Sequence, residues 1–219
     1  MFEKYIGPFS EKNGCFGAMD DLGRVLPNDN ETSDVRKDRK VGIFYFLWIG
    51  EHGTDGPYDI SAIVKAHPKA IESEENWYAA GGGPRGNHHF WGKPLFGYYR
   101  SSDDWVMRKH LQMLTDAGVD FIVFDTTNGP TYDERMQQII AIWYDVPKMS
   151  FYTNSASGQT MEHIFKNIYK NKELHDKYPR LEELWFKHDG KPMIIGIEAE
   201  ASQEIKEFFT FKESVWPNA

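Results

Sequence analysis

Apolar runs that end in polar or acidic residues recur along this chain. The first is VGIFYFLW at residues 41–48, and VDFIVFDTTN, PKMSFYTN and KPMIIGIEAE repeat the pattern. A short, continuous apolar run bounded by polar residues is typical of a strand that is buried on both faces, as in a parallel sheet. FFTFKES supplies a fifth run of this kind. The pattern therefore predicts five parallel strands, each ending in side chains that can take part in chemistry.

Between these runs, apolar residues recur at the spacing of a helix, i, i+3, i+4 and i+7. The three sets are Met107, Leu111 and Leu114; then Met136, Ile139, Ile140 and Trp143; then Met161, Ile164, Phe165 and Ile168. We expect Ser102 to cap the first helix and Thr131 with Glu134 to form a capping box at the start of the second. A brief helix is expected over 202–207. The alternation of strand and helix predicts an α/β fold.

The predicted architecture is a (β/α)8 barrel of the TIM type, of which this chain supplies only the first five or so β/α units. A closed barrel needs eight strands and typically about 250 residues, whereas the chain has 219. Residues 1–40 are polar and rich in turn signals, so we expect an N-terminal arm there and a barrel domain over 41–219, incomplete on its C-terminal side. A long loop over 49–101 follows strand one, and loops of this length are usually functional.

Charge and composition exclude several classes of partner. The formal net charge is −8 and no block of Lys and Arg occurs, whereas a nucleic-acid partner requires a clustered positive face. No apolar run approaches the roughly 18 residues that cross a bilayer. The N-terminus lacks a basic region followed by an apolar stretch, so the chain as written is expected to be cytoplasmic, with export left open if the native N-terminus differs. The single cysteine, Cys15, excludes an internal disulfide and a thiolate zinc site.

Aromatic residues are unusually placed. They make up 15% of the chain, with seven Trp and eleven Tyr, and several lie in Gly-rich segments such as AAGGGPRGNHHFWGKPLFGYYR. Flat rings in such segments are typical of surfaces that stack on the C–H faces of sugars. The alternative is that the rings pack against the barrel and hold the loops in place. For any single aromatic residue the two interpretations are equally good.

Several long motifs carry a family resemblance. The segments DDLGRVLP, VGIFYFLW, GPYDI, HHFWGKPLFGYYRSSDDWVMRKH, AGVDFIVFDTTNG and FYTN together resemble the glycoside hydrolase 71/99-like family of carbohydrate-active (β/α) barrel proteins. The resemblance runs from about residue 20 to the end of the chain. It implies a barrel that acts on α-linked glycans with two carboxylates flanking the scissile bond. In the endo-mannosidase branch the paired glutamates lie on a late strand, beyond any strand of this chain, so they are not carried over.

The candidates for catalysis are carboxylates at the C-terminal ends of the predicted strands, where a barrel holds its active site. They are Asp125 after strand two, Glu198 after strand four and Glu213 near the end of strand five. Asp125 either contacts substrate or caps its own loop. If strand four continues through Glu200, Glu198 and Glu200 lie on the same face of the sheet, because side chains alternate along a strand. Glu200 is instead solvated if the chain turns there before the next helix.

Further polar and aromatic residues form the predicted substrate-binding rim. They are Tyr45, Trp48, His88, His89, Trp91, Arg100, Asn128, Tyr152, Asn154 and Glu200. His88 and His89 are expected to hydrogen-bond sugar hydroxyls rather than a metal, since neighbours on an extended chain point apart and no HxH or HExxH spacing occurs. Arg100 either binds a sugar hydroxyl or pairs with Asp103 on the surface. GGGPRG lacks the features of a phosphate loop. No metal and no cofactor is expected.

The sequence therefore predicts a glycoside hydrolase-like protein that acts on a carbohydrate substrate. The alternative is a non-catalytic carbohydrate-binding protein or a truncated barrel remnant, and a third possibility is another barrel hydrolase that uses a metal. Five parallel strands leave unpaired edges, so we also expect self-association of the isolated chain.

Overall fold

The computed structural model describes residues 19–27, 31, 36–53, 55–143 and 147–215. The chain divides into two compact units, Met1–Val41 and Gly42–Ala219. In the described part of the first unit, Met19 and Val25 form an antiparallel bridge. Asp20 closes the turn between them by accepting hydrogen bonds from the backbone N–H groups of Leu22 and Arg24. Cys15 lies outside the described residues.

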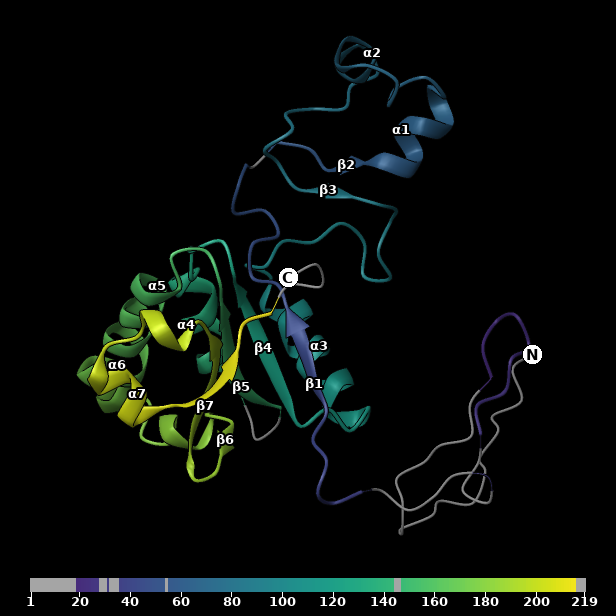
Figure 1. The fold of residues 1–219 in the computed structure, drawn as a ribbon. Coiled ribbons are helices and arrows are strands. Elements are labelled where there is room, and N and C mark those ends of the chain that lie inside the picture. The colour runs from purple at the N-terminus through teal and green to yellow at the C-terminus, as the bar shows by residue number, and fades with distance from the viewer. Residues whose placement is uncertain (1–18, 28–30, 32–35, 54, 144–146, 216–219) are drawn as a thin grey trace. The chain divides into compact units, whose positions relative to one another are not determined.

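The second unit is built on a parallel sheet. Its strands are β1 (Gly42–Tyr45), β4 (Phe121–Thr126), β5 (Lys148–Thr153), β7 (Lys191–Gly196) and β8 (Thr210–Glu213). They are neighbours in the order β1-β4-β5-β7-β8 and every pair is parallel (Figure 1). All five predicted strands are present, and their order in the sheet follows their order in the chain. The prediction of an α/β fold with a parallel sheet is confirmed.

Helices connect these strands. They are α3 (Asp104–Asp116), α4 (Asp133–Ile142), α5 (Ser157–Ile164), the π-helical turn η1 (Phe165–Tyr169), α6 (Lys172–Lys177), the short 3-10 helices η2 (Leu181–Glu183) and η3 (Glu198–Glu200), and α7 (Gln203–Phe208). The cap of α3 is Asp103, which accepts from the N–H of Val106, and not Ser102. The capping box expected at α4 is absent, since Tyr132 occupies the N-cap position there without a side-chain hydrogen bond.

The core lies between the sheet and the helices. Ile122 and Phe124 of β4, Phe151 of β5 and Ile194 of β7 are fully buried and belong to one apolar cluster. The apolar residues predicted on α3, α4, α5 and η1 supply nine further buried members of this cluster. Because side chains alternate along a strand, Val123, Asp125, Tyr152 and Ile195 lie on the opposite face. We call this the inner face of the sheet.

The predicted loop over 49–101 has secondary structure of its own. β2 (Tyr58–Asp59) and β3 (His89–Phe90) pair in parallel, and α1 (Ile60–Ala66) and α2 (Glu74–Ala79) lie between them in the chain. Asp59 begins α1 by accepting from the N–H of Ala62. A further short strand, β6 (Lys187–His188), pairs antiparallel with β7 and was not predicted as a strand. A turn through Asp189 and Gly190 joins β6 to β7.

Candidate active site

Asp125 lies at the C-terminal end of β4, on the inner face. The sheet register pairs it with Tyr152, which in turn pairs with Ile195, so these three side chains share one face. Oδ1 of Asp125 accepts hydrogen bonds from the N–H and the hydroxyl group of Thr127, at 3.1 and 2.7 Å. Among the described residues, Oδ2 receives no hydrogen bond. Asp125 thus fixes its own loop with one oxygen and keeps the other available to a ligand.

A second group of side chains gathers near Asp125 and was missed by the sequence analysis. Nε2 of His52 lies 2.8 Å from the hydroxyl of Tyr132, and Oε1 of Glu51 lies 3.1 Å from Nε of Arg135. Burial raises the pKa of Tyr132, and the negative charges of Asp125 and Glu51 raise it further. The phenol therefore keeps its proton. Glu51 and His52 belong to the motif GEHG, a few residues after strand one. They lie in a turn and not at the end of the strand, so the rule that places polar residues at strand ends did not select them.

Tyr132 has a backbone conformation that is rare for a bulky residue. Its φ of 52° and ψ of 50° lie in the left-handed region. For residues other than glycine this region costs on the order of 1–2 kcal/mol. Such a conformation persists where surrounding contacts impose it, and it often marks functional positions. The hydrogen bond with His52 is one such contact.

Aromatic rings line the inner face beside these groups. Phe44 stacks on Tyr152 with their centroids 5.4 Å apart, and Phe46 meets Trp48 edge to face at 5.8 Å. The hydroxyl of Tyr152 donates to the carbonyl of Val215 at 3.2 Å. Oδ1 of Asn154 accepts from the hydroxyl of Ser214 at 2.8 Å. The predicted rim residues Tyr152 and Asn154 are therefore tied to the segment that follows β8.

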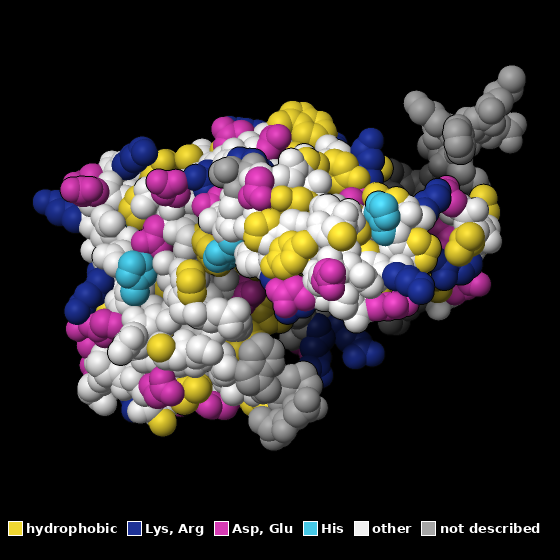
Figure 2. All heavy atoms as spheres, turned by 90° about the horizontal axis from the view of Figure 1, so that it is seen from above, with side chains coloured by type: hydrophobic (Ala, Val, Ile, Leu, Met, Phe, Trp, Pro, Cys, Tyr) yellow, Lys and Arg dark blue, Asp and Glu magenta, His cyan; other side chains and the backbone are white. Residues whose placement is uncertain are grey.

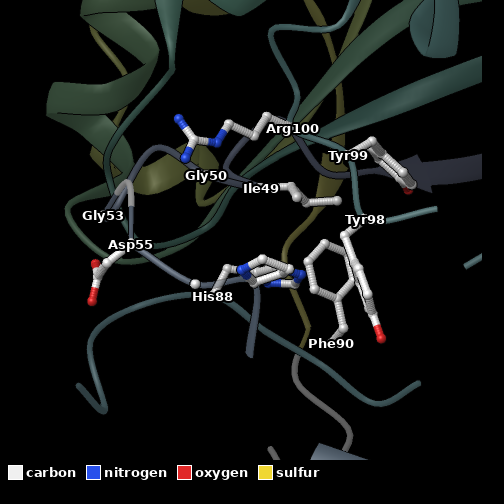
Figure 3. Close-up of a pocket in the computed structure, with 11 residues that line it drawn as sticks. Ile49, Gly50, Gly53, Asp55, His88, Phe90, Tyr98, Tyr99 and Arg100 are labelled. Carbon is white, nitrogen blue, oxygen red and sulfur yellow. The ribbon is translucent and has the colours of Figure 1, made fainter. Parts of the chain in front are cut away.

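A cavity of about 230 Å³ lies within the segment 49–101. Its lining residues are Ile49, Gly50, Gly53, Asp55, Gly56, Pro57, His88, Phe90, Tyr98, Tyr99 and Arg100. Figure 3 shows the His88 ring next to the rings of Phe90 and Tyr98, with Arg100 beyond Ile49 and Gly50. Trp48 meets His88 edge to face at 5.2 Å. Predicted residues His88 and Arg100 thus line one cavity.

His89 has a different environment from His88. Its two ring nitrogens lie 2.8 Å from the carbonyl oxygen of Asn87 and 2.7 Å from that of Gly82. The ring also stacks on Tyr58, with centroids 5.2 Å apart. Its contacts therefore hold the segment together. Trp91 is 79% exposed, and Asn128 is also exposed.

Tyr45 lies on the helix side of the sheet and not on the inner face. Its hydroxyl is 3.1 Å from Nδ1 of His110 on α3, and its ring packs against Phe124. Burial raises the pKa of Tyr45, so the hydroxyl stays protonated. The expectation that Tyr45 joins the rim is not met, because its side chain packs against the apolar core on the helix side of the sheet.

The other predicted carboxylates do not join Asp125 on its face. β7 ends at Gly196, and Glu198 and Glu200 lie in η3, so the alternation of the strand does not reach them. Oε2 of Glu200 accepts from the N–H of Gly158 at the start of α5. Glu213 pairs with Gly196, and a Cβ on Gly196 would point towards Ser157 and Met161 of α5. Glu213 therefore lies on the helix side of the sheet. The catalytic roles of Glu198 and Glu213 stay predictions, but the register argument for them does not hold.

Three general findings bear on the kind of site. Among the described residues, no group of three His, Cys, Asp or Glu side chains is arranged to hold a metal ion. No helix in the described part of the chain combines the length and apolar character needed to cross a membrane. On the face shown in Figure 2, acidic and basic side chains are interspersed.

No protein-family model and no curated protein matches this chain. Solved structures do. Two structures of the GH99 endo-alpha-mannosidase from Bacteroides thetaiotaomicron, one in complex with BIS-TRIS-propane, are 17% and 19% identical to it, with TM-scores of 0.37 and 0.38. They match 71% and 70% of this chain, and 41% and 44% of their own. A structure described as a glycoside hydrolase-like protein is 15% identical with a TM-score of 0.39, over 83% of this chain and 48% of its own. The chain is thus similar to glycoside hydrolase structures and spans less than half of their length.

Proposed function

We propose that this chain is a glycoside hydrolase-like protein that binds a glycan over the C-terminal ends of its parallel strands. The observation that carries the proposal is Asp125, a half-buried carboxylate on the inner face whose Oδ2 receives no hydrogen bond from the described residues. The motif FDTTNG, which contains Asp125, is one of those that resemble the glycoside hydrolase 71/99-like family. The C-terminal strand ends are also where barrel enzymes hold their active sites.

The reaction we propose is hydrolysis of a glycosidic bond. One carboxyl group gives its proton to the glycosidic oxygen as the bond from this oxygen to the anomeric carbon breaks. A second carboxylate acts as base or nucleophile, so that the oxygen of one water molecule ends on the anomeric carbon. Asp125 supplies one of these two groups. Glu198 and Glu213 remain the candidates for the second that the sequence suggests.

Substitution of Asp125 by Asn tests this function. We expect Asp125→Asn to lower the rate of hydrolysis of α-linked oligosaccharides on the order of 10²-fold or more, because the amide neither gives nor takes a proton. Released reducing ends are measured with the whole chain over a panel of glycans. The matched control is Asp116→Asn at the exposed end of α3, which should keep the wild-type rate. If no glycan is cleaved by the wild type, the hydrolase proposal is wrong.

The second candidate function is carbohydrate binding without hydrolysis. The aromatic cavity in the segment 49–101 favours it, because this cavity contains none of the predicted catalytic carboxylates. Glycan binding measured by calorimetry, with no release of reducing ends over a long incubation, would support binding alone.

A further inference from the structure

The cavity in the segment 49–101 has the size of a site for one small ring. Its volume of about 230 Å³ is below the range of about 300–1,000 Å³ that holds drug-sized ligands. All its lining residues come from Ile49 to Arg100, so one stretch of chain builds it. A ligand of this size is a single ring and not a run of several sugar units.

One wall of the cavity is aromatic. The rings of Phe90 and Tyr98 lie 5.2 Å apart, and Figure 3 shows them side by side next to His88. The hydroxyl of Tyr98 donates to Oδ2 of Asp59 at 2.6 Å, which fixes the position of its ring. Asp59 is itself buried and caps α1. The two ring planes are tilted by 59° to one another, so the rings form an angled apolar wall, and either ring is suited to the C–H face of a sugar.

His88 provides the polar part of the cavity. Neither of its ring nitrogens makes a hydrogen bond within the described part of the chain, and its ring contacts are with Trp48 and Phe90. Burial, and then the charge of His89, lower the pKa of His88. The imidazole is therefore neutral near pH 7 and offers one donor and one acceptor. A sugar hydroxyl also offers both, so the two groups are complementary.

The charged residues of the lining are Asp55 and Arg100, whose formal charges cancel. The lining therefore has no net charge that would select an anionic or a cationic ligand. The carboxylate of Asp55 accepts from the hydroxyl of Tyr58 at 2.6 Å, which holds it at the edge of the cavity.

We propose that this cavity binds a single neutral sugar unit, with Phe90 and Tyr98 against its C–H face and His88 hydrogen-bonded to one of its hydroxyl groups. The choice of a carbohydrate as the ligand rests on the proposed function, but the binding needs no hydrolysis and no contact with Asp125. The site would hold one end unit of a glycan, or a free monosaccharide.

The test is an NMR titration of the whole chain with neutral aldohexoses and their methyl glycosides, and with glucuronate as the acidic counterpart. We expect at least one neutral sugar to bind and glucuronate not to bind better. His88→Phe keeps a flat ring but removes both nitrogens, so it should weaken binding about tenfold or more, as expected for one lost hydrogen bond. His88→Gln keeps a donor and an acceptor and should restore part of the affinity.

The matched control is His67→Phe, at an exposed position after α1, which should leave the dissociation constant unchanged. Absence of binding by every sugar, or equal affinity in the wild type and His88→Phe, would overturn the inference. Asp125→Asn separates it from the hydrolase proposal, because that variant should lose cleavage and retain monosaccharide binding. Sugar binding that depends on His88, in a chain that cleaves nothing, would support the inference and refute the hydrolase.

Discussion

At the scale of single residues, the pair of Tyr45 and His110 shows how burial sets the protonation of side chains. Burial lowers the pKa of His110, so its imidazole is neutral in the folded chain. The Tyr45 hydroxyl keeps its proton, and its oxygen lies 3.1 Å from Nδ1 of His110, within hydrogen-bonding distance. A charged imidazolium at this buried position would lose its hydration, so burial favours the neutral ring.

This pair makes the stability of the chain depend on pH. In the unfolded chain His110 takes up a proton below about pH 6.5, whereas in the folded chain it does so only at lower pH. Stability should therefore fall as the pH decreases from 6.5 towards the lowered pKa of the folded chain. We expect His110→Gln to flatten the slope of Tm against pH between 7 and 5. His67→Gln, at an exposed position, is the control, and an equal change of slope in both variants would contradict the assignment.

At the scale of elements, β6 and β7 form a hairpin that is closed by a turn of two residues. Asp189 and Gly190 have φ angles of 52° and 80°, the left-handed pair that a tight two-residue hairpin turn requires. A Cβ on Gly190 would meet no atom within 4 Å, so only the backbone conformation demands glycine there.

Replacement of this glycine isolates the conformational cost. We expect Gly190→Ala to lower the free energy of unfolding by about 1 kcal/mol, because a residue with a Cβ disfavours the left-handed region. Urea unfolding followed by circular dichroism measures the change. Gly86→Ala is the matched control, since Gly86 also has no atom within 4 Å but does not have a positive φ. If both variants lose the same stability, the turn is not the cause.

At the scale of the whole molecule, the parallel sheet has two edges to which no further strand is paired among the residues that the structure describes. Among the residues described, β1 pairs only with β4 and β8 pairs only with β7 in the parallel sheet. Phe44 and Phe46 are neighbours on the inner face, and each is 46% exposed. Unpaired backbone groups beside exposed apolar side chains favour association with another chain.

We therefore expect this chain to associate with itself as its concentration rises. Sedimentation velocity over a range of concentrations measures the effect. Ile43→Lys places a charge on the edge strand β1, where residue 43 is 43% exposed, and should reduce association. Ile71→Lys changes an isoleucine that is 68% exposed outside the sheet and should not. A single monomeric species at every concentration would contradict the prediction.

The sequence by itself determined the strands, their order and most of the helices. Apolar runs such as VDFIVFDTT specify strands of a parallel sheet. The strands β4 and β5 are mostly buried, whereas β1 and β8 are largely exposed. Helical spacing located α3, α4 and α5 for a similar reason, since periodicity is a local property of the chain. Asp125 could be placed at a strand end on the same grounds.

Only the tertiary structure decided which candidates come together. Tyr45 and Glu213 fell on the helix side because the face of a residue depends on register and on where each strand ends. The ion pair of Glu51 with Arg135 was not predicted, because Glu51 lies in a turn and not at the end of a strand. His88 and His89 are adjacent in sequence and identical in type, yet one lines a cavity and the other binds carbonyl oxygens. These distinctions depend on the path that the folded chain takes, which the pattern of apolar and polar residues does not display.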